Sequence, residues 1–334
     1  MGVGELLKIL EVNNLVTTLI TENKSENLIE NVNFVVKEGE TIGIVGESGS
    51  GKSITALSLM DLLPKNIKVT KGQVIFDNKN LLELNDNEIR NIRGKDISMI
   101  FQDNMSSLNP VFTIGNQIIE AIRVHSDISK KEAKMKALEL LKKVGLSRPE
   151  KILKEYPYML SGGMRQRAMI AMALTSNPKL LIADEPTTAL DVTIQAQIVE
   201  LIKRIKDEYK MAVILITHDI GLIAEMADRV IVMYAGEIVE DTDVNTLFNN
   251  PQHPYTMALL KSVPHINDKL DKKLVSIPGT VPEHYEDISS CRFMSRCEYA
   301  FDKCKIHPDI KKINDDHAVR CYASWEGKFD YEGK

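Results

Sequence analysis

The alternation of apolar and polar positions divides the chain into strand-like and helix-like stretches. Short apolar, β-branched runs predict strands near residues 8–12, 32–36, 40–45, 73–76 and 97–101, the first of them in an antiparallel layer around the third. Residues 113 to about 177, which include ISKKEAKMKALELLKKVGL, change to the period of amphipathic helices. Apolar runs at 180–183 and 212–216 then predict strands of a parallel sheet that is buried on both faces. This order indicates an α/β fold that contains a helical subdomain.

A change of composition marks the end of the α/β part. The stretch NNPQHPYTMALLKSVPHIND is rich in Pro, Asn and His, which is typical of a boundary between domains. We therefore expect a large domain over residues 1–258, with its helical subdomain at about 103–177, and a C-terminal extension over residues 259–334.

Composition and charge exclude several classes of protein. The 334 residues are 43% hydrophobic and 27% charged, which is ordinary for a globular protein with a sizeable core. A net charge of -5 argues against a protein that binds nucleic acid through bulk electrostatics. No apolar run approaches the roughly 18 residues that a membrane-spanning helix needs. The start, MGVGELLKILEV, lacks the features of a signal peptide, so we expect a cytoplasmic location.

A glycine-rich motif follows the strand at 40–45 and precedes a helical pattern. It matches G-x-x-x-x-G-K-[ST] at each fixed position and consists of Gly46, Glu47, Ser48, Gly49, Ser50, Gly51, Lys52 and Ser53. In this strand–loop–helix context, backbone N–H groups and the helix N-terminus converge on phosphate oxygens. We expect Lys52 to reach the β- and γ-phosphates of a nucleotide and the Ser53 hydroxyl to bind Mg²⁺.

Polar residues follow the two later strands at the edge where ligands bind in α/β sheets. Asp184 and Glu185 end the first of these strands, and Asp184 is expected in the Mg²⁺ shell. Glu185 is placed to orient or deprotonate an attacking water. His218 follows the second strand, where it would contact the γ-phosphate and that water. Without the glycine-rich motif, these carboxylates would be read as a solvated pair at a strand end.

A further loop begins a helix between these motifs, in YMLSGGMRQRAMIAMAL. Its start offers a second anion site, which one nucleotide does not need unless the site serves ATP held by another subunit. The stretch resembles the signature of the ATP-binding-cassette ATPases, and the rest of the family pattern occurs in the expected order. The matching residues are Ser161, Gly162, Gly163 and Gln166 of the signature, Gln102 of the Q-loop, Asp191 of the D-loop and His218 of the switch.

The resemblance implies a P-loop NTPase fold: a RecA-like core, an antiparallel β layer and a helical subdomain. It also implies that two cassettes pack head to tail, each ATP lying between one phosphate loop and the other chain's signature. Gln102 would join Ser53 and Asp184 around Mg²⁺ and link closure to a membrane subunit. Members of the family usually stack an aromatic residue on the adenine. Here only Leu19 lies near that place, so we expect weaker base selectivity.

All four cysteines lie in the C-terminal extension, at Cys291, Cys297, Cys304 and Cys321. In a cytoplasmic protein, clustered cysteines are read first as metal ligands, and the C-x2-C pairs of zinc ribbons are absent. The stretch, with its IPG and C-x-F-x-x-R-C sequences, is similar to the extension of oligopeptide and dipeptide importer ATPases. That resemblance implies a [4Fe–4S] cluster, with Zn²⁺ and free or disulfide-bonded cysteines as alternatives. We expect His307 and His317 to be surface residues or to lie behind the ligands.

The function expected from this resemblance is ATP hydrolysis that energises the import of dipeptides or oligopeptides. The implied partners are a second cassette, which we expect to be a paralogue, two membrane permease subunits and an external peptide-binding protein, with the chain at the cytoplasmic face of the membrane. The alternatives are a soluble cassette ATPase acting on nucleic acid or ribosomes, an importer subunit for nickel or another small solute, and a regulatory module without turnover. Intact Lys52, Glu185 and His218 argue against the last.

Overall fold

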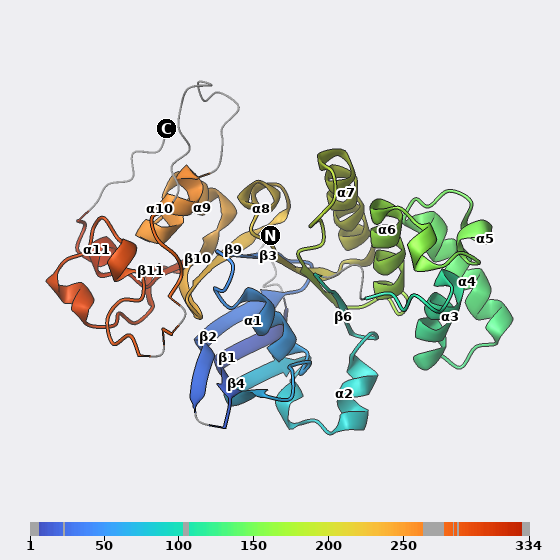
Figure 1. Cartoon of the computed structure of the whole chain (residues 1–334), viewed down its shortest axis with the longest axis horizontal. Helices are drawn as coiled ribbons and strands as arrows, with labels where there is room; N and C mark the ends of the chain where they lie inside the picture. The colour runs from blue at the N-terminus through green and yellow to red at the C-terminus, as the bar shows by residue number, and fades with distance from the viewer. Residues whose placement is uncertain are drawn as a thin grey trace, which may run out of the picture. The chain divides into compact units, whose positions relative to one another are not determined.

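The computed structural model describes most of the chain, and its described residues form two compact units (Figure 1). The description covers residues 7–22, 24–102, 107–262, 277–282, 284–285 and 287–328. The first unit comprises Met1–Ile9, Lys37–Glu40 and Glu83–Leu215, and the second comprises Leu10–Val36, Thr41–Leu82 and Ile216–Lys334.

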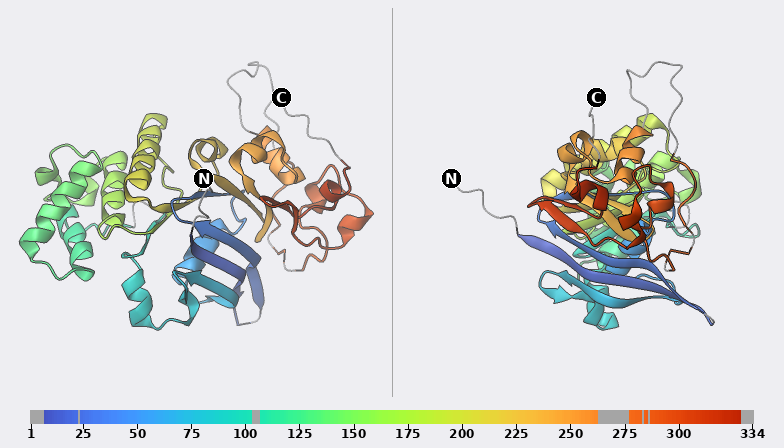
Figure 2. Two further views of the ribbon diagram at one scale, coloured as in Figure 1. Left: turned by 180° about the vertical axis from the view of Figure 1, so that it is seen from behind. Right: turned by 90° about the vertical axis from the view of Figure 1, so that its left-hand side faces the viewer.

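The second unit contains a four-stranded sheet of order β2-β1-β4-β5, whose long strands run side by side in Figure 2. Its strands are β1 (Lys8–Ile20), β2 (Ser25–Lys37), β4 (Ile67–Phe76) and β5 (Lys79–Asn80). β1 and β4 are antiparallel, and their register shifts after Asn13, beside Asn14 at φ 49°. This irregularity lets β1 continue well past the expected end at residue 12. The expected strand at 40–45 does not join this layer.

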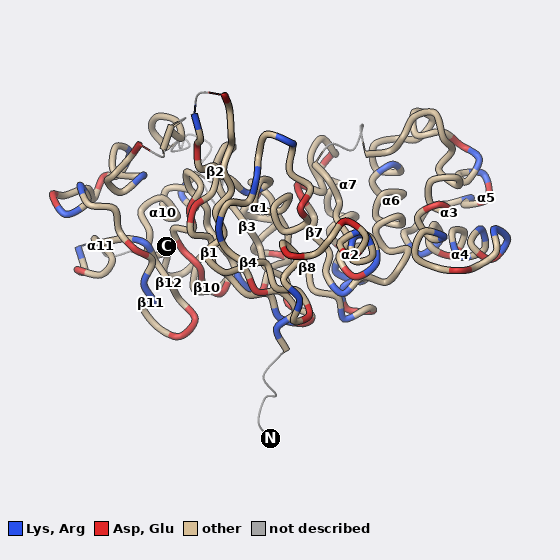
Figure 3. Tube along the Cα trace, turned by 90° about the horizontal axis from the view of Figure 1, so that it is seen from below, with Lys and Arg blue, Asp and Glu red and all other residues tan. Residues whose placement is uncertain are grey.

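That strand, β3 (Thr41–Val45), belongs to the other sheet, in which the second unit supplies the order β11-β12-β10-β9-β3. The other members are β9 (Arg229–Tyr234), β10 (Glu237–Asp243), β11 (Lys311–Asn314) and β12 (His317–Val319). β3 is parallel to β9 and buried along its whole length. β12 pairs with β10, so the C-terminal extension adds strands to the sheet that carries the phosphate loop. Figure 3 shows charges of both signs on these outer strands.

The second unit also contains several helices. They are α1 (Lys52–Leu59), α8 (Ile220–Met226), α9 (Val244–Asn249), α10 (Pro254–Lys261) and α11 (Tyr322–Trp325), with short 3₁₀ turns at Leu81–Glu83, Met294–Arg296 and Asp302–Lys305. Glycine at position 43 lets α8 approach β3, because a Cβ there would lie 2.4 Å from Ile223 Cδ1.

The first unit combines three strands, in the order β8-β7-β6, with a group of helices. The strands are β6 (Ile97–Ile100), β7 (Leu180–Asp184) and β8 (Ala212–Ile216), and β6 is parallel to β7. The helices are α2 (Asp86–Ile92), α3 (Ile114–Val124), α4 (Lys130–Lys143), α5 (Pro149–Ile152), α6 (Gly162–Ala173) and α7 (Val192–Tyr209), with a 3₁₀ turn at Pro157–Met159. α3, α4 and α6 pack on one another in the region expected to be helical. Within the described part of the chain, no helix is both long and apolar enough to cross a membrane.

Candidate functional site

The glycine-rich motif connects β3 to α1, and its backbone requires glycine at two positions. Gly46 (φ 157°) passes so close to β9 that a Cβ would lie 2.2 Å from the Met233 carbonyl oxygen. Gly51 (φ 101°) has the left-handed conformation of the residue before α1, and a Cβ there would lie 2.7 Å from Ile29 Cγ2. These glycines let the loop turn tightly between β3 and α1. The N–H groups at the start of α1 are open to an anion.

Lys52 is the first residue of α1, and its side chain folds back over the loop. Its Nζ donates hydrogen bonds to the carbonyl oxygens of Gly46, at 2.8 Å, and Glu47, at 2.9 Å. The side chain is buried, whereas Ser48 and Gly49 at the tip of the loop are exposed and Ser53 is half-buried. The ammonium group is thus held within the loop beside its exposed tip.

The first unit brings Glu185 and Gln102 together, although 83 positions separate them in the sequence. Asp184, at the end of β7, is buried, and Glu185 follows it at φ 48°, a left-handed conformation. One oxygen of Glu185, Oε2, accepts hydrogen bonds from Gln102 Nε2, at 2.9 Å, and from Thr188 Oγ1, at 2.8 Å. Two donors on one oxygen hold the Glu185 side chain in place.

The signature-like residues lie at the start of α6, also in the first unit. Ser161 caps the helix by accepting a hydrogen bond from Met164 N, and Ser161 and Gly162 are exposed. A Cβ at Gly163 would lie 2.7 Å from Ile194 Cγ2, in the first turn of α7. The exposed helix start is therefore open to an anion.

Three other residues expected at the site have contrasting surroundings. Gln166 is fully buried, and its amide atoms have no hydrogen-bond partner among the described residues. Asp191 caps α7 by accepting a hydrogen bond from Ile194 N at 3.0 Å. His218 is exposed just after β8, and the neighbouring Asp219 caps α8. Of these, His218 and Asp191 lie at the surface, where a ligand has access.

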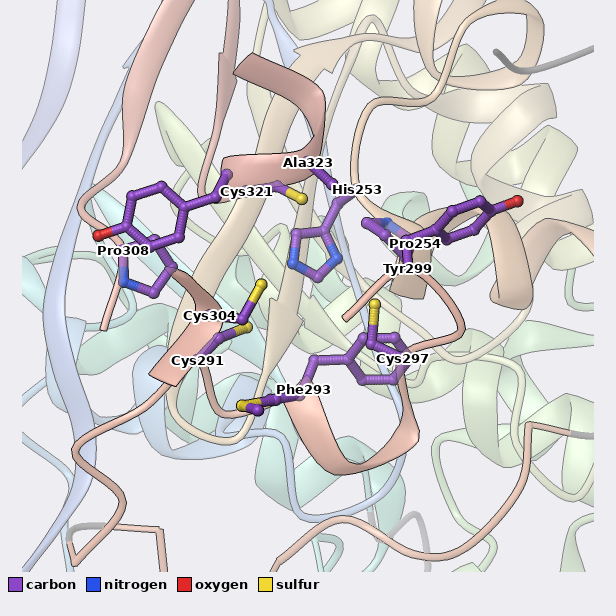
Figure 4. A pocket seen from close by; sticks show the side chains of 12 residues that line it. His253, Pro254, Cys291, Phe293, Cys297, Tyr299, Cys304, Pro308, Cys321 and Ala323 are labelled. Carbon is purple, nitrogen blue, oxygen red and sulfur yellow. The ribbon is translucent and has the colours of Figure 1, made fainter. Parts of the chain in front are cut away.

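The four cysteines line one small pocket in the second unit, which we call the thiol pocket (Figure 4). Their side chains point toward a common space beside the His253 ring. Apolar and aromatic groups complete the lining, chiefly Phe293, Met294, Tyr299 and Tyr322. His253 was not expected here from the sequence, because it precedes the first cysteine by 38 positions.

Burial sets the protonation of the groups in the thiol pocket when no metal is present. It raises the pKa of Cys291 to about 12 and those of Cys297 and Cys321 to about 11. It lowers the pKa of His253 to about 3, and the nearby Arg320 charge acts in the same direction. His253 Nδ1 accepts a hydrogen bond from Tyr255 N at 3.0 Å, so the neutral ring carries its proton on Nε2.

His307 and His317, which were expected at the surface or behind the ligands, do not line this pocket, and His317 does not lie at the surface. His317 is buried and its Nε2 lies 2.8 Å from an oxygen of Glu240, because β12 pairs with β10. His307 Nε2 lies 2.9 Å from an oxygen of Glu237. Burial opposes ionisation of Glu237, but the His307 hydrogen bond and two nearby arginines prevail and lower its pKa. The two glutamates of β10 thus hold the extension against the sheet.

Two regions of the chain match family models. Residues 29–188 match the ABC transporter family, and residues 239–304 match the C-terminal region of oligopeptide/dipeptide transporters. The second match spans three of the four cysteines and most of the strand β10 on which the extension is anchored.

Curated relatives are similar over nearly the full length of the chain. A probable peptide ABC transporter ATP-binding protein of Sinorhizobium fredii is 52% identical over 95% of this chain and 96% of its own. The oligopeptide transport protein AppD of Bacillus subtilis is 50% identical over 94% and 96%, and the dipeptide transport protein DppD of the same organism is 49% identical over 94% of each.

Solved structures confirm the expected fold class. The dimeric cassette MJ0796, bound to ADP and Pi, superimposes with a TM-score of 0.64 at 32% identity, over 71% of this chain and 99% of that one. CbiO1 from Clostridium perfringens, part of the ABC transporter complex cbiONQ, gives 0.62 at 26% identity, over 74% and 92%. The chain therefore belongs to the ATP-binding proteins of the oligopeptide and dipeptide ABC transporter family.

Proposed function

We propose that this chain is the ATP-hydrolysing subunit that energises the import of dipeptides or oligopeptides across the cytoplasmic membrane. The observation that carries the proposal is the near full-length similarity, at about 50% identity, to peptide transporter ATP-binding proteins. The extension supports the same branch, since it matches the family model of that region. The alternative of a soluble ATPase acting on nucleic acid or ribosomes has no support from these relatives.

The residues around the phosphate loop suggest how ATP is bound. Lys52 would exchange its two carbonyl partners in the loop for the β- and γ-phosphates. Ser53, Gln102 and Asp184 would hold Mg²⁺, which neutralises charge on the phosphates. The loop N–H groups at the start of α1 would supply the remaining contacts.

The residues for hydrolysis are assigned in the same way. Glu185 would orient the attacking water and accept its proton, while the hydrogen bonds from Gln102 and Thr188 hold its carboxylate in place. His218 would contact the γ-phosphate from the end of β8. Ser161, at the exposed start of α6, would face ATP held by a second cassette, together with the rest of the signature and Asp191.

A complete transporter needs further chains. The sequence holds one phosphate loop, so a second cassette is required, and we propose a paralogue in this position. Two membrane permeases would transmit the motion from Gln102, and an external binding protein would deliver the peptide. The chain would then lie at the cytoplasmic face of the membrane, with residues 1–258 as the cassette and residues 259–334 as the extension.

The cysteines of the thiol pocket are the candidate ligands for the cluster implied by the resemblance. Within the described ranges, no group of three His, Cys, Asp or Glu side chains is arranged to hold a metal ion. A [4Fe–4S] cluster instead takes one thiolate at each of four separate irons, and four cysteines line this enclosed, apolar space. We propose that these four hold such a cluster. Binding would require deprotonation of the buried thiols, whose pKa values are raised. The free energy of cluster binding would therefore have to exceed the free energy of deprotonating these thiols.

Two measurements test the assignment of function. Membranes that express the tagged chain are solubilised, and the subunits that co-purify are identified by mass spectrometry. Uptake of labelled dipeptides, tetrapeptides and nickel is then compared between cells with the native chain and cells with Lys52→Met. Peptide uptake that depends on Lys52 supports the proposal. Nickel uptake alone, or co-purification with ribosomes and no permease, contradicts it.

The cluster has a separate test. The chain is purified without oxygen, and its iron, sulfide and zinc are measured together with its visible absorbance. About four irons and four sulfides per chain, lost in Cys304→Ser, are expected. One zinc per chain, or a metal-free chain under these conditions, contradicts the cluster and leaves the ATPase assignment intact.

A further inference from the structure

An arginine of the extension, Arg296, forms an ion pair with a residue of the phosphate loop. Arg296 and Glu47 form a bidentate pair, in which Nη1 donates to Oε2 at 2.8 Å and Nη2 to Oε1 at 3.0 Å. The Arg296 side chain is 4% exposed and that of Glu47 29%, so the pair is partly shielded from water. Glu47 is the second residue of the phosphate loop, and 249 positions of chain separate it from its partner.

Arg296 is itself held in one position by the rest of the extension. Its Nε donates to the Pro278 carbonyl oxygen at 2.7 Å, and Nη2 also reaches that of Gly279 at 3.3 Å. The guanidinium lies within 6 Å of the Tyr234 and Phe293 rings, close enough for cation–π attraction. These partners fix the Arg296 side chain between the extension and the phosphate loop.

The backbone of Glu47 is fixed as well, and it positions the lysine of the motif. Its N–H donates to the Tyr255 hydroxyl at 2.8 Å, from α10, and its carbonyl oxygen accepts the hydrogen bond from Lys52 Nζ. The carbonyl also accepts the Ser50 N–H at 3.2 Å, so this loop residue has four partners, of which two lie beyond residue 250. A displacement of Glu47 would move the carbonyl that holds the Lys52 ammonium.

Arg296 also lies, along the chain, between two cysteines of the thiol pocket. It ends the 3₁₀ turn Met294–Arg296, which lies between Cys291 and Cys297, and both cysteines line the pocket. Arg296 N donates to the Phe293 carbonyl oxygen at 3.0 Å, so the turn and the pocket wall form one short unit. A change at Cys297 would therefore act directly on Arg296, the residue before it in the chain.

We propose that Arg296 is a positioning residue for ATP binding, and that it transmits the state of the thiol pocket to the phosphate loop through Glu47. The proposal concerns the ATPase reaction alone. It requires neither peptide as the substrate nor a particular group in the pocket.

The first test separates this role from general loosening of the extension. The Kd for ATP is measured by equilibrium titration of the full chain for Arg296→Gln, Glu47→Gln and the double variant. Arg292→Gln is the matched control, since Arg292 is equally buried and pairs with Glu30 and the Ala235 carbonyl instead of the loop. Circular dichroism and thermal unfolding show whether each variant is folded.

We expect each single variant to raise the Kd about fivefold or more, the range of coupling between linked sites. The double variant should bind no more weakly than the worse single variant, because both remove one interaction. Arg296→Lys should recover part of the affinity, and kcat should change less than KM. Unchanged affinity in both single variants, additive effects in the double variant, or an equal loss in Arg292→Gln would overturn the positioning role. Glu47→Gln keeps the test valid if Arg296→Gln does not fold.

The second test concerns transmission. Cys297→Ser is made in the native chain and in Arg296→Gln, both purified without oxygen, and ATP titrations are repeated. We expect Cys297→Ser to weaken ATP binding in the native background and to have little further effect when Arg296 is replaced. An equal effect in both backgrounds, or none in either, would overturn the transmission.

Discussion

The assignment of Glu185 as the group that activates water leads to a specific kinetic prediction. Glu185→Gln keeps the shape of the side chain and an oxygen that can accept the hydrogen bonds from Gln102 and Thr188. The fold and ATP binding should therefore be retained, while proton transfer is lost. General-base catalysis contributes about 10² to 10⁴ in rate. The expected rise in the barrier is therefore about 3–5 kcal/mol, since each factor of ten corresponds to about 1.4 kcal/mol.

The assay measures phosphate release at saturating ATP by the chain purified with its accompanying subunits, and ATP affinity by a separate titration. Thr188→Val is the control, because it removes one hydrogen bond to the same oxygen but keeps the carboxylate. It should slow turnover by about tenfold or less. If Glu185→Gln keeps more than a tenth of the native turnover, or if the control is equally slow, the carboxylate does not act as proposed. Loss of ATP affinity in Glu185→Gln would mean that the side chain supports binding instead.

Three further predictions concern binding and the docking of the extension. Lys52→Met should weaken ATP binding by at least about tenfold, as judged by titration, because it removes the charge that meets the phosphates. Glu240 is fully buried and accepts hydrogen bonds from His317 and from two backbone N–H groups. Glu240→Ala should therefore lower the free energy of unfolding by about 3–5 kcal/mol and lower the Tm. An unchanged Tm would show that Glu240 does not anchor the extension. The pKa of Glu237 is lowered from 4.5, so its ionised form stabilises the fold above that pH and the stabilisation disappears as the pH falls below it. Glu237→Gln should make the Tm less dependent on pH between about 6 and 3.5.

The sequence predicted the local features of the cassette well, because each depends on residues that are close together in the chain. The strand before the phosphate loop, the loop itself and the helix after it are specified within Thr41–Leu59 by apolar residues, glycines and a helix start. The predicted strands near 8–12 and 32–36 were too short, since the bulge in β1 and the pairing of β2 depend on partners elsewhere.

Contacts across the extension could not be predicted in this way. Arg296 was recognised only as part of a sequence pattern, and nothing near it in the chain identifies Glu47 as its partner. His317 was expected at the surface or behind the ligands, and its own segment, INDDHAV, is polar. Its burial against Glu240 depends on the pairing of β12 with β10, which is a tertiary feature.

The sequence by itself determined that this protein has one ATP-binding cassette, with a phosphate loop, a signature and an extension that carries four cysteines. Local order and spacing are enough for that, since backbone conformation and motif chemistry act over a few residues. Only the tertiary structure decided that the cysteines line one pocket, that His253 borders it, and that Arg296 joins this region to Glu47. Those contacts, like the pairing of β12 with β10, join segments that are distant in the chain, and sequence spacing carries no record of them.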